Sequence, residues 1–145
     1  MTTSSKNSPP PVERVAMGRI WWVGLGAVAL AALVNGLVRA LALALMDVDP
    51  GFMPLVSPAF LPLTIIGGGA GVLVYALVGW RVRRRPITVY RIVAGIALLL
   101  SFLPDLGLVG NMPGAIPATV GTLMLMHSLT AAIVVGLLTT AARQA

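Results

Sequence analysis

Four long apolar runs, separated by short polar turns, limit what this 145-residue chain can fold into. They occupy residues 20–46, 58–80, 87–103 and 117–140. The hydrocarbon core of a bilayer is about 30 Å thick, and a helix of about 20 apolar residues crosses it. Helix is the state that satisfies each backbone in lipid, because four segments are too few to close a barrel. The sequence therefore predicts an all-α fold, a polytopic four-helix bundle in a membrane.

The first and third runs depart most from the standard length. Residues 20–46 would form a helix roughly 40 Å long, so we expect it to tilt or to protrude from the bilayer. The third run is the shortest, and Pro104 follows it. Because proline lacks a backbone donor, we expect the third helix to end or kink there.

Composition excludes a soluble enzyme. The chain is 58% apolar and 10% charged, whereas soluble domains average about 45–50% and about 25%. It has no cysteine, one histidine and four acidic residues. Thiolate and iron–sulfur sites are thereby excluded, and a single histidine with one acid nearby falls short of the usual three or four metal ligands. We expect no metal, no cofactor and no enzymatic activity.

The charges indicate how the helices are oriented. If all four runs span, nine of the ten cations fall on one side: Lys6, Arg14, Arg19, Arg81, Arg83, Arg84, Arg85, Arg91 and Arg143. The opposite turns carry acids and no Lys or Arg. By the positive-inside rule both termini are cytoplasmic, which predicts a multi-pass protein of a bacterial cytoplasmic (inner) membrane. The cluster Arg81, Arg83, Arg84 and Arg85 acts in topology and attracts anionic lipid, and we expect no nucleic-acid partner.

Residues 1–16 are polar and rich in proline, which predicts a disordered cytoplasmic tail before a helical domain at residues 17–145. A signal peptide cleaved after the pattern at residues 27–29 is the alternative interpretation. The apolar run continues well past that point, whereas the apolar region of a signal peptide usually covers 7–15 residues. We therefore expect the first run to be a membrane span.

Small residues predict where the helices approach one another. Gly67 and Gly71 are four apart in the second run, and Ser128, Ala132 and Gly136 have the same spacing in the fourth. Apolar burial does not drive association in lipid, so small residues let backbones pack closely. Packing within the bundle is the simpler interpretation, and homodimerisation through the same faces is the alternative.

A few polar residues interrupt the apolar runs in their outer halves. They are Asn35, Arg39, Ser101, Asp105 and His127. Ionisable groups inside a membrane are costly and need a partner or a purpose. One interpretation is structural, with an Arg39–Asp105 pair and hydrogen bonds that fix the helices. The second is a ligand-binding site in which Arg39 holds an anionic group and His127 or Asp105 exchanges a proton. The third is an Arg39 that extends outward alone.

These residues also carry a resemblance to a family. Asn35 and Arg39, the basic turn ending in Arg85 and Pro86, the LLSFLPD run at residues 99–105 and the LMH run at residues 125–127 are its features. Over residues 15–142 the chain resembles an uncharacterised family of small bacterial four-helix integral membrane proteins, a domain of unknown function. The resemblance implies a four-helix bundle and no particular activity.

Two functions follow from these observations. The first is a structural or accessory membrane subunit, because the turns are too short to form a separate domain. Its partners would be the lipid bilayer and a membrane protein or further copies of this chain. The alternative is a binder or carrier of a small anionic, lipid or quinone-like molecule through the polar residues of the outer half.

Overall fold

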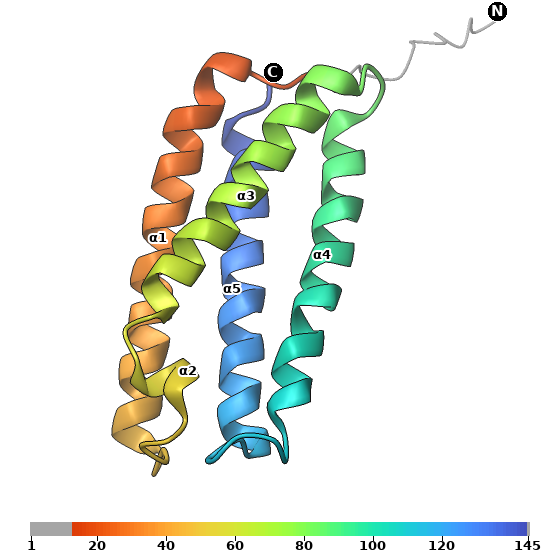
Figure 1. The fold of residues 1–145 in the computed structure, drawn as a ribbon. Helices are drawn as coiled ribbons and strands as arrows, with labels where there is room; N and C mark the ends of the chain where they lie inside the picture. The colour runs from red at the N-terminus through yellow and green to blue at the C-terminus, as the bar shows by residue number, and fades with distance from the viewer. Residues whose placement is uncertain (1–12, 145) are drawn as a thin grey trace, which may run out of the picture.

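The computed structural model describes residues 13–144 and consists of helices (Figure 1). Four of them are long: α1 (Met17–Leu45), α3 (Phe60–Arg81), α4 (Pro86–Leu108) and α5 (Pro117–Ala141). A single turn, α2 (Met53–Val56), lies between α1 and α3. The predicted all-helical fold with four long apolar helices is confirmed.

The helices form a bundle in which α3 and α5 separate α1 from α4 (Figure 1). α1 packs against α5 and α3, and α4 packs against the same two helices from the other side. α3 crosses α5 obliquely. It meets α4 at the turn of residues 82–85 and diverges from it toward the opposite end (Figure 1). This divergence positions the site described below.

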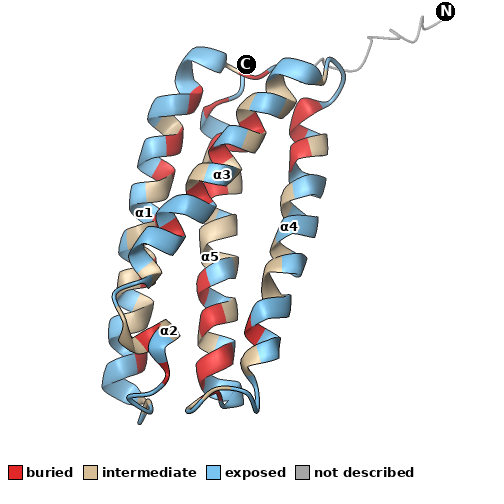
Figure 2. Cartoon of the chain, in the orientation of Figure 1, coloured by how far each residue is buried: buried red, intermediate tan, exposed pale blue. Residues whose placement is uncertain are grey.

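The outward faces of the long helices are apolar and exposed (Figure 2). In the most apolar stretch of each helix, only 17% to 22% of the residues are buried inside the protein. Trp22 and Leu45, for example, are 78% and 80% exposed. A soluble monomer rarely exposes apolar surface on this scale, and lipid is the solvent that suits it. The chain is a multi-pass membrane protein.

Both ends of the described chain meet at one end of the bundle. Val15 pairs with Arg143 in an antiparallel bridge, and the Ala16 N–H donates to the Ala142 carbonyl at 2.8 Å. Residues 13–16, expected in a disordered tail, thus lie ordered against the bundle. Val15 is 9% exposed and fits against Gly79, which has no side chain to exclude it. Residues 1–12 of the expected tail lie outside the described residues.

The sequence predicts that the third helix ends or kinks at Pro104; the end is wrong, because α4 continues through Pro104 to Leu108. Proline removes one backbone donor, and within a membrane bundle neighbouring helices can hold such a segment in place. Here Asp105, in the turn after the proline, lies against His127 of α5. The extra turn places Asp105 inside the bundle, where it is 7% exposed.

The close helix contacts use a different glycine from the one expected. A Cβ on Gly68 would lie 3.1 Å from Val28 of α1, and one on Gly71 would lie 3.3 Å from Val134 of α5. Gly67 and Gly136 have no such neighbour within 4 Å, and Ala132 is exposed. Of the expected pair on α3, Gly71 therefore makes a close contact, Gly68 takes the place of Gly67, and Ala132 and Gly136 of α5 face outward.

Candidate binding cavity

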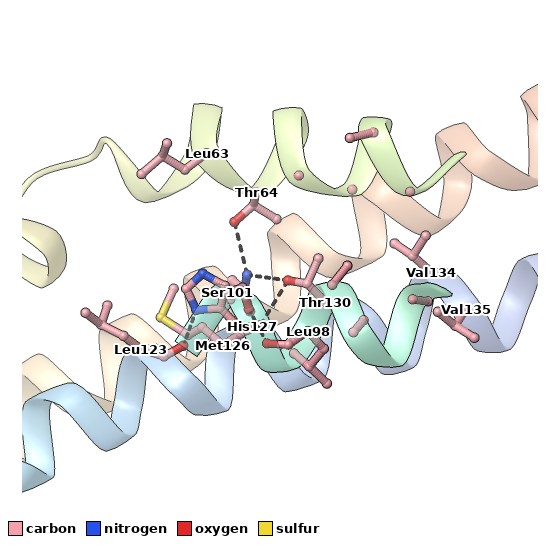
Figure 3. A pocket seen from close by; sticks show the side chains of 18 of the residues that line it. Leu63, Thr64, Leu98, Ser101, Leu123, Met126, His127, Thr130, Val134 and Val135 are labelled. Atoms are coloured by element: carbon pink, nitrogen blue, oxygen red, sulfur yellow. Dashed lines mark hydrogen bonds between the residues drawn. The ribbon is translucent and has the colours of Figure 1, made fainter. Parts of the chain in front are cut away.

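A cavity of about 620 Å³ lies between α3, α4 and α5 (Figure 3). Its walls are mostly apolar, and Asn35 of α1 also lines it. Cavities of roughly 300–1,000 Å³ with apolar walls and a few polar groups are typical of small-molecule sites. Its size and lining therefore suit a small, largely apolar molecule.

The cavity opens sideways, between α3 and α4. Leu63 and Gly67 on α3 line it and are exposed, as are Val93 and Ala97 on α4. Gly67 and Ala97 contribute little bulk, so the two helices do not close over the space between them. A molecule dissolved in the bilayer can reach the cavity without entering water.

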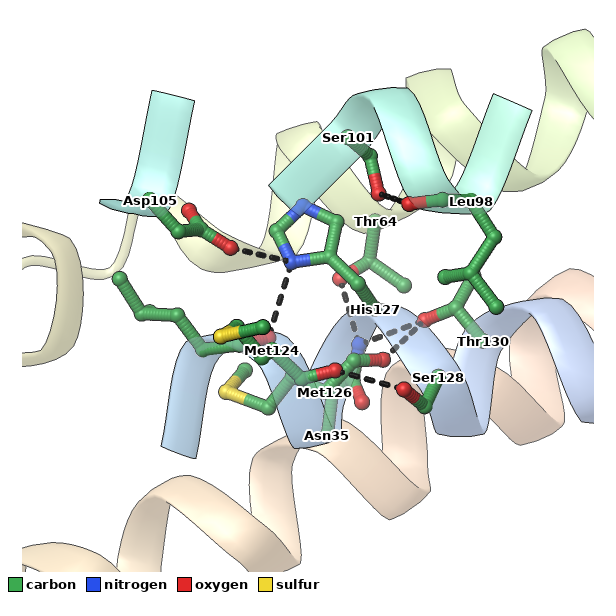
Figure 4. A network of polar contacts seen from close by, with 11 residues as sticks. Asn35, Thr64, Leu98, Ser101, Asp105, Met124, Met126, His127, Ser128 and Thr130 are labelled. Carbon is green, nitrogen blue, oxygen red and sulfur yellow. Dashed lines mark hydrogen bonds and ion pairs between the residues drawn. The ribbon is translucent and has the colours of Figure 1, made fainter. Parts of the chain in front are cut away.

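Asn35 forms the centre of a buried polar group (Figure 4). Its Nδ2 donates to Thr64 Oγ1 at 3.0 Å and to Thr130 Oγ1 at 2.9 Å. Each threonine hydroxyl donates its own proton to a carbonyl one turn earlier in its helix, at 2.8 Å and 2.9 Å. Three helices are linked in this way. Asn35 is 2% exposed, and its Oδ1 has no hydrogen-bond partner in the described part of the chain.

A second polar pair, Asp105 and His127, lines the same cavity (Figure 4). His127 Nδ1 lies 3.2 Å from Asp105 Oδ2 and 2.8 Å from the Leu123 carbonyl oxygen. Nδ1 can carry one proton, and the shorter contact assigns that proton to Leu123. Asp105 Oδ2 is accordingly buried and near the imidazole, but it accepts no hydrogen bond from any described residue.

The remaining two residues of the predicted site have different positions. Ser101 lines the cavity and donates to the Leu98 carbonyl at 2.7 Å. Arg39 does not line it. Arg39 Nε donates to the Leu55 carbonyl at 2.7 Å, and Nη2 donates to the Val56 carbonyl at 2.6 Å.

The Arg39–Asp105 pair suggested by the sequence is therefore wrong. Asp105 lies against His127 instead, and the short helix α2 offers Arg39 carbonyl groups that no later turn of helix uses. The guanidinium also lies 5.4 Å from the centre of the Phe60 ring. Four of the five predicted residues thus share one cavity, and Arg39 braces the adjacent loop.

Sequence reasoning missed three side chains of this region. Thr64 and Thr130 hold Asn35, and hydroxyls inside apolar spans were the available signal. The third is Tyr90, which is 1% exposed and lines the cavity. Its ring packs edge-to-face on Tyr75, with centroids 4.8 Å apart. Within residues 13–144, no three His, Cys, Asp or Glu side chains gather into a metal site.

Four apolar spans around a side-opening cavity define a small four-helix membrane protein. The model of a family of unknown function, DUF6069, matches residues 15–144, and the chain belongs to this family. The resemblance found in the sequence is thereby confirmed. Neither the curated proteins nor the solved structures include a match to the chain.

Proposed function

We propose that this protein binds a small lipid-like or quinone-like molecule in the cavity between α3, α4 and α5. The cavity itself carries the proposal: it is large enough for such a molecule, it is mostly apolar, and it opens toward the bilayer. Asn35, Asp105 and His127 are polar residues in its lining. An amphipathic molecule could therefore place its apolar part against the walls and its polar head beside these residues.

The proposed role is non-enzymatic. An acid–base pair alone is insufficient for most covalent chemistry, which also needs a nucleophile within reach of the base. Ser101 is the hydroxyl on α4 nearest in sequence to Asp105, and its proton is already donated to Leu98 of its own helix. Thr64 and Thr130 are likewise donating to carbonyls. This use of the hydroxyl protons favours binding over catalysis.

We further propose that the end carrying both termini faces the cytoplasm of a bacterial cell, with the protein in its inner membrane. Arg81, Arg83, Arg84 and Arg85 lie exposed at that end, and they share it with the chain ends, Arg19 and Arg143. Such clustering matches the positive-inside rule. Asp105 then lies toward the outer side of the bilayer, since it belongs to the turn of α4 farthest from this end, whereas Tyr90 lines the cavity near the cytoplasmic end of the same helix.

A matched pair of variants tests the binding function. Gly67 lines the cavity and Gly69 does not, and neither would bring a Cβ within 4 Å of another group. Gly67→Phe fills the space, whereas Gly69→Phe adds the same bulk outside it. Native mass spectrometry after gentle extraction should find a small molecule on the wild type and on G69F but not on G67F. Equal retention by both variants would place the molecule elsewhere.

A structural or accessory subunit is the second candidate. The outward position of Ala132 and Gly136 favours it, because exposed small residues on a membrane helix permit close packing by another helix. The same extraction separates the two functions. A stoichiometric protein partner, or a second copy of the chain, would support the subunit role, and an isolated chain that carries only a small molecule would contradict it.

A further inference from the structure

Two buried polar atoms without a partner among the described residues belong to residues that line the cavity, and they have one chemical property in common. In the described part of the chain, two buried side-chain atoms lack a hydrogen-bond partner: Asn35 Oδ1 and Asp105 Oδ2. Both residues line the cavity, and both atoms are acceptors. Buried acceptors are costly to leave unpaired. Resting on the proposed function, we propose that the bound molecule is neutral and that its head carries a hydroxyl that donates to Asn35 Oδ1.

The orientation of the Asn35 amide follows from its neighbours. Thr64 and Thr130 have each given their only hydroxyl proton to a carbonyl, so toward Asn35 they can act only as acceptors. The Asn35 group that faces them must therefore be the NH₂. The oxygen is left as the free atom, and turning the amide over would place three oxygens together without a proton between them.

The Asp105–His127 pair lies close to the Asn35 amide, because His127 and the Asn35 partner Thr130 both belong to α5. His127 and Thr130 are three residues apart, which is about 4.5 Å of helical rise. With its Nδ1 proton directed at Leu123, a neutral His127 also has a lone pair on Nε2. A head with two donors could therefore serve Asn35 and the Asp105–His127 pair together.

Anionic molecules fit this lining poorly. Arg39, the cation expected to bind them, donates to backbone carbonyls outside the cavity, and no other Lys or Arg is found among the lining residues. An anion would meet the Asp105 carboxylate and the Asn35 oxygen. A head with acceptors only, such as a quinone, would meet the same atoms, whereas its reduced quinol offers two hydroxyls.

The test compares two probes that differ in one proton. 1-Dodecanol and its methyl ether have the same apolar chain, and only the alcohol donates. Binding to the wild-type protein in nanodiscs is followed by the shift in thermal unfolding temperature over a titration. We expect the alcohol to bind about tenfold more tightly than the ether, the size of effect that one satisfied buried acceptor produces.

Two variants show whether Asn35 is responsible. Asn35→Leu removes the acceptor and leaves both threonine protons on their carbonyls, so the alcohol and the ether should bind N35L equally. Thr140→Val is the control, since Thr140 lies outside the cavity and donates within α5; T140V should keep the preference for the alcohol. A preference that persists in N35L overturns the assignment to Asn35.

The outcomes separate this inference from the proposed function. If the wild type binds alcohol and ether equally and G67F binds neither, the cavity is a binding site but the donor assignment is wrong. If no probe shifts the wild type, both proposals fail. The wild-type comparison holds even if N35L does not fold. Decylbenzoquinol and dioctanoylglycerol then distinguish a quinol from a glycerolipid as the source of the hydroxyl, and tight binding of either supports the inference.

Discussion

At the scale of single residues, Arg39 holds the loop around α2 in place and does not line the cavity. Its side chain reaches across the loop to the carbonyls of Leu55 and Val56, at 2.7 Å and 2.6 Å. Those carbonyls belong to the end of α2 and have no helical donor of their own. A charged donor suits them because hydrogen bonds to ionised groups are stronger than neutral ones.

Replacing Arg39 with leucine should therefore destabilise the loop. Arg39→Leu leaves two carbonyls without their donor and should lower the free energy of unfolding by about 1–3 kcal/mol. Thermal unfolding in nanodiscs measures the effect. Arg39→Lys keeps a charged donor and should lose less. Because Arg39 lies outside the cavity, R39L should bind 1-dodecanol as the wild type does, and a loss of binding would return Arg39 to the site.

Glu13 supplies the missing cap of α4. Arg85, the residue before α4, makes no capping bond with its side chain. Instead, Glu13 Oε2 accepts hydrogen bonds from the N–H groups of Ile87 and Thr88, at 3.0 Å and 3.2 Å. Burial raises the pKa of Glu13, but the hydrogen bonds from Thr88 and Ile87 and the charge of Arg85 together lower it below its ordinary 4.5.

This lowered pKa makes the contribution of Glu13 depend on pH. The stabilisation is fully present above the unfolded-state pKa and is lost as the pH falls through the lower pKa of the folded state. At pH 7, Glu13→Ala should reduce stability by about 1 kcal/mol, as loss of a helix cap does. Well below pH 4.5 the wild type and E13A should converge in thermal unfolding. A constant difference between them at all pH values would contradict the capping role.

At the element scale, the contact between α1 and α3 depends on Gly24, because a glycine has no side chain. A Cβ at Gly24 would lie 2.6 Å from Val72 Cγ1. Valine has little freedom to turn away in a helix, so α1 and α3 would have to separate.

Gly24→Ala should consequently destabilise the bundle by about 1–3 kcal/mol, the usual cost of overpacking. Gly26 lies in the same helix, but a Cβ there meets nothing within 4 Å. Gly26→Ala should therefore be neutral, or stabilise the helix by up to about 1 kcal/mol. Thermal unfolding of the two variants side by side measures the difference, and equal behaviour would mean that α1 and α3 do not meet at Gly24.

The elements themselves follow from length and hydropathy, whereas their contacts depend on details that these patterns lack. A run of glycines carries no apolar side chain to mark its inward face, so only the spacing to Gly71 favours Gly67 over Gly68. A proline within one helix predicts an end or a kink, whereas the contact between Asp105 and His127 joins two helices and is absent from such a local pattern. The Glu13 cap joins residues 74 positions apart.

At the scale of the whole molecule, the charge distribution favours the proposed orientation of the bundle, and the absence of cysteine makes this orientation easy to test. Gln144→Cys and Asn111→Cys place single thiols on exposed residues at opposite ends. In intact bacterial cells, a membrane-impermeant maleimide should label N111C, and it should label Q144C only after permeabilisation. The reverse pattern would contradict the cytoplasmic position of the termini.

The site was predictable in part. Asn35, Ser101, Asp105 and His127 stand out as polar residues within apolar runs, and helical rise places them at similar depth. The cavity they share results from the divergence of α3 and α4, which no local pattern encodes. Arg39 shows the same limit, because its partners belong to α2, a single turn that hydropathy does not reveal.

Photolabelling tests the binding site most directly. A long-chain alcohol that carries a diazirine would be incorporated into vesicles with the wild-type protein, irradiated, and its attachment sites mapped by mass spectrometry. We predict that labels concentrate on cavity residues such as Leu63, Val93 and Leu98, and that excess 1-dodecanol displaces them. Leu25 and Leu33, which are 65% and 68% exposed on α1, should be labelled weakly and without competition. Equal labelling of both sets would contradict a binding site between α3, α4 and α5.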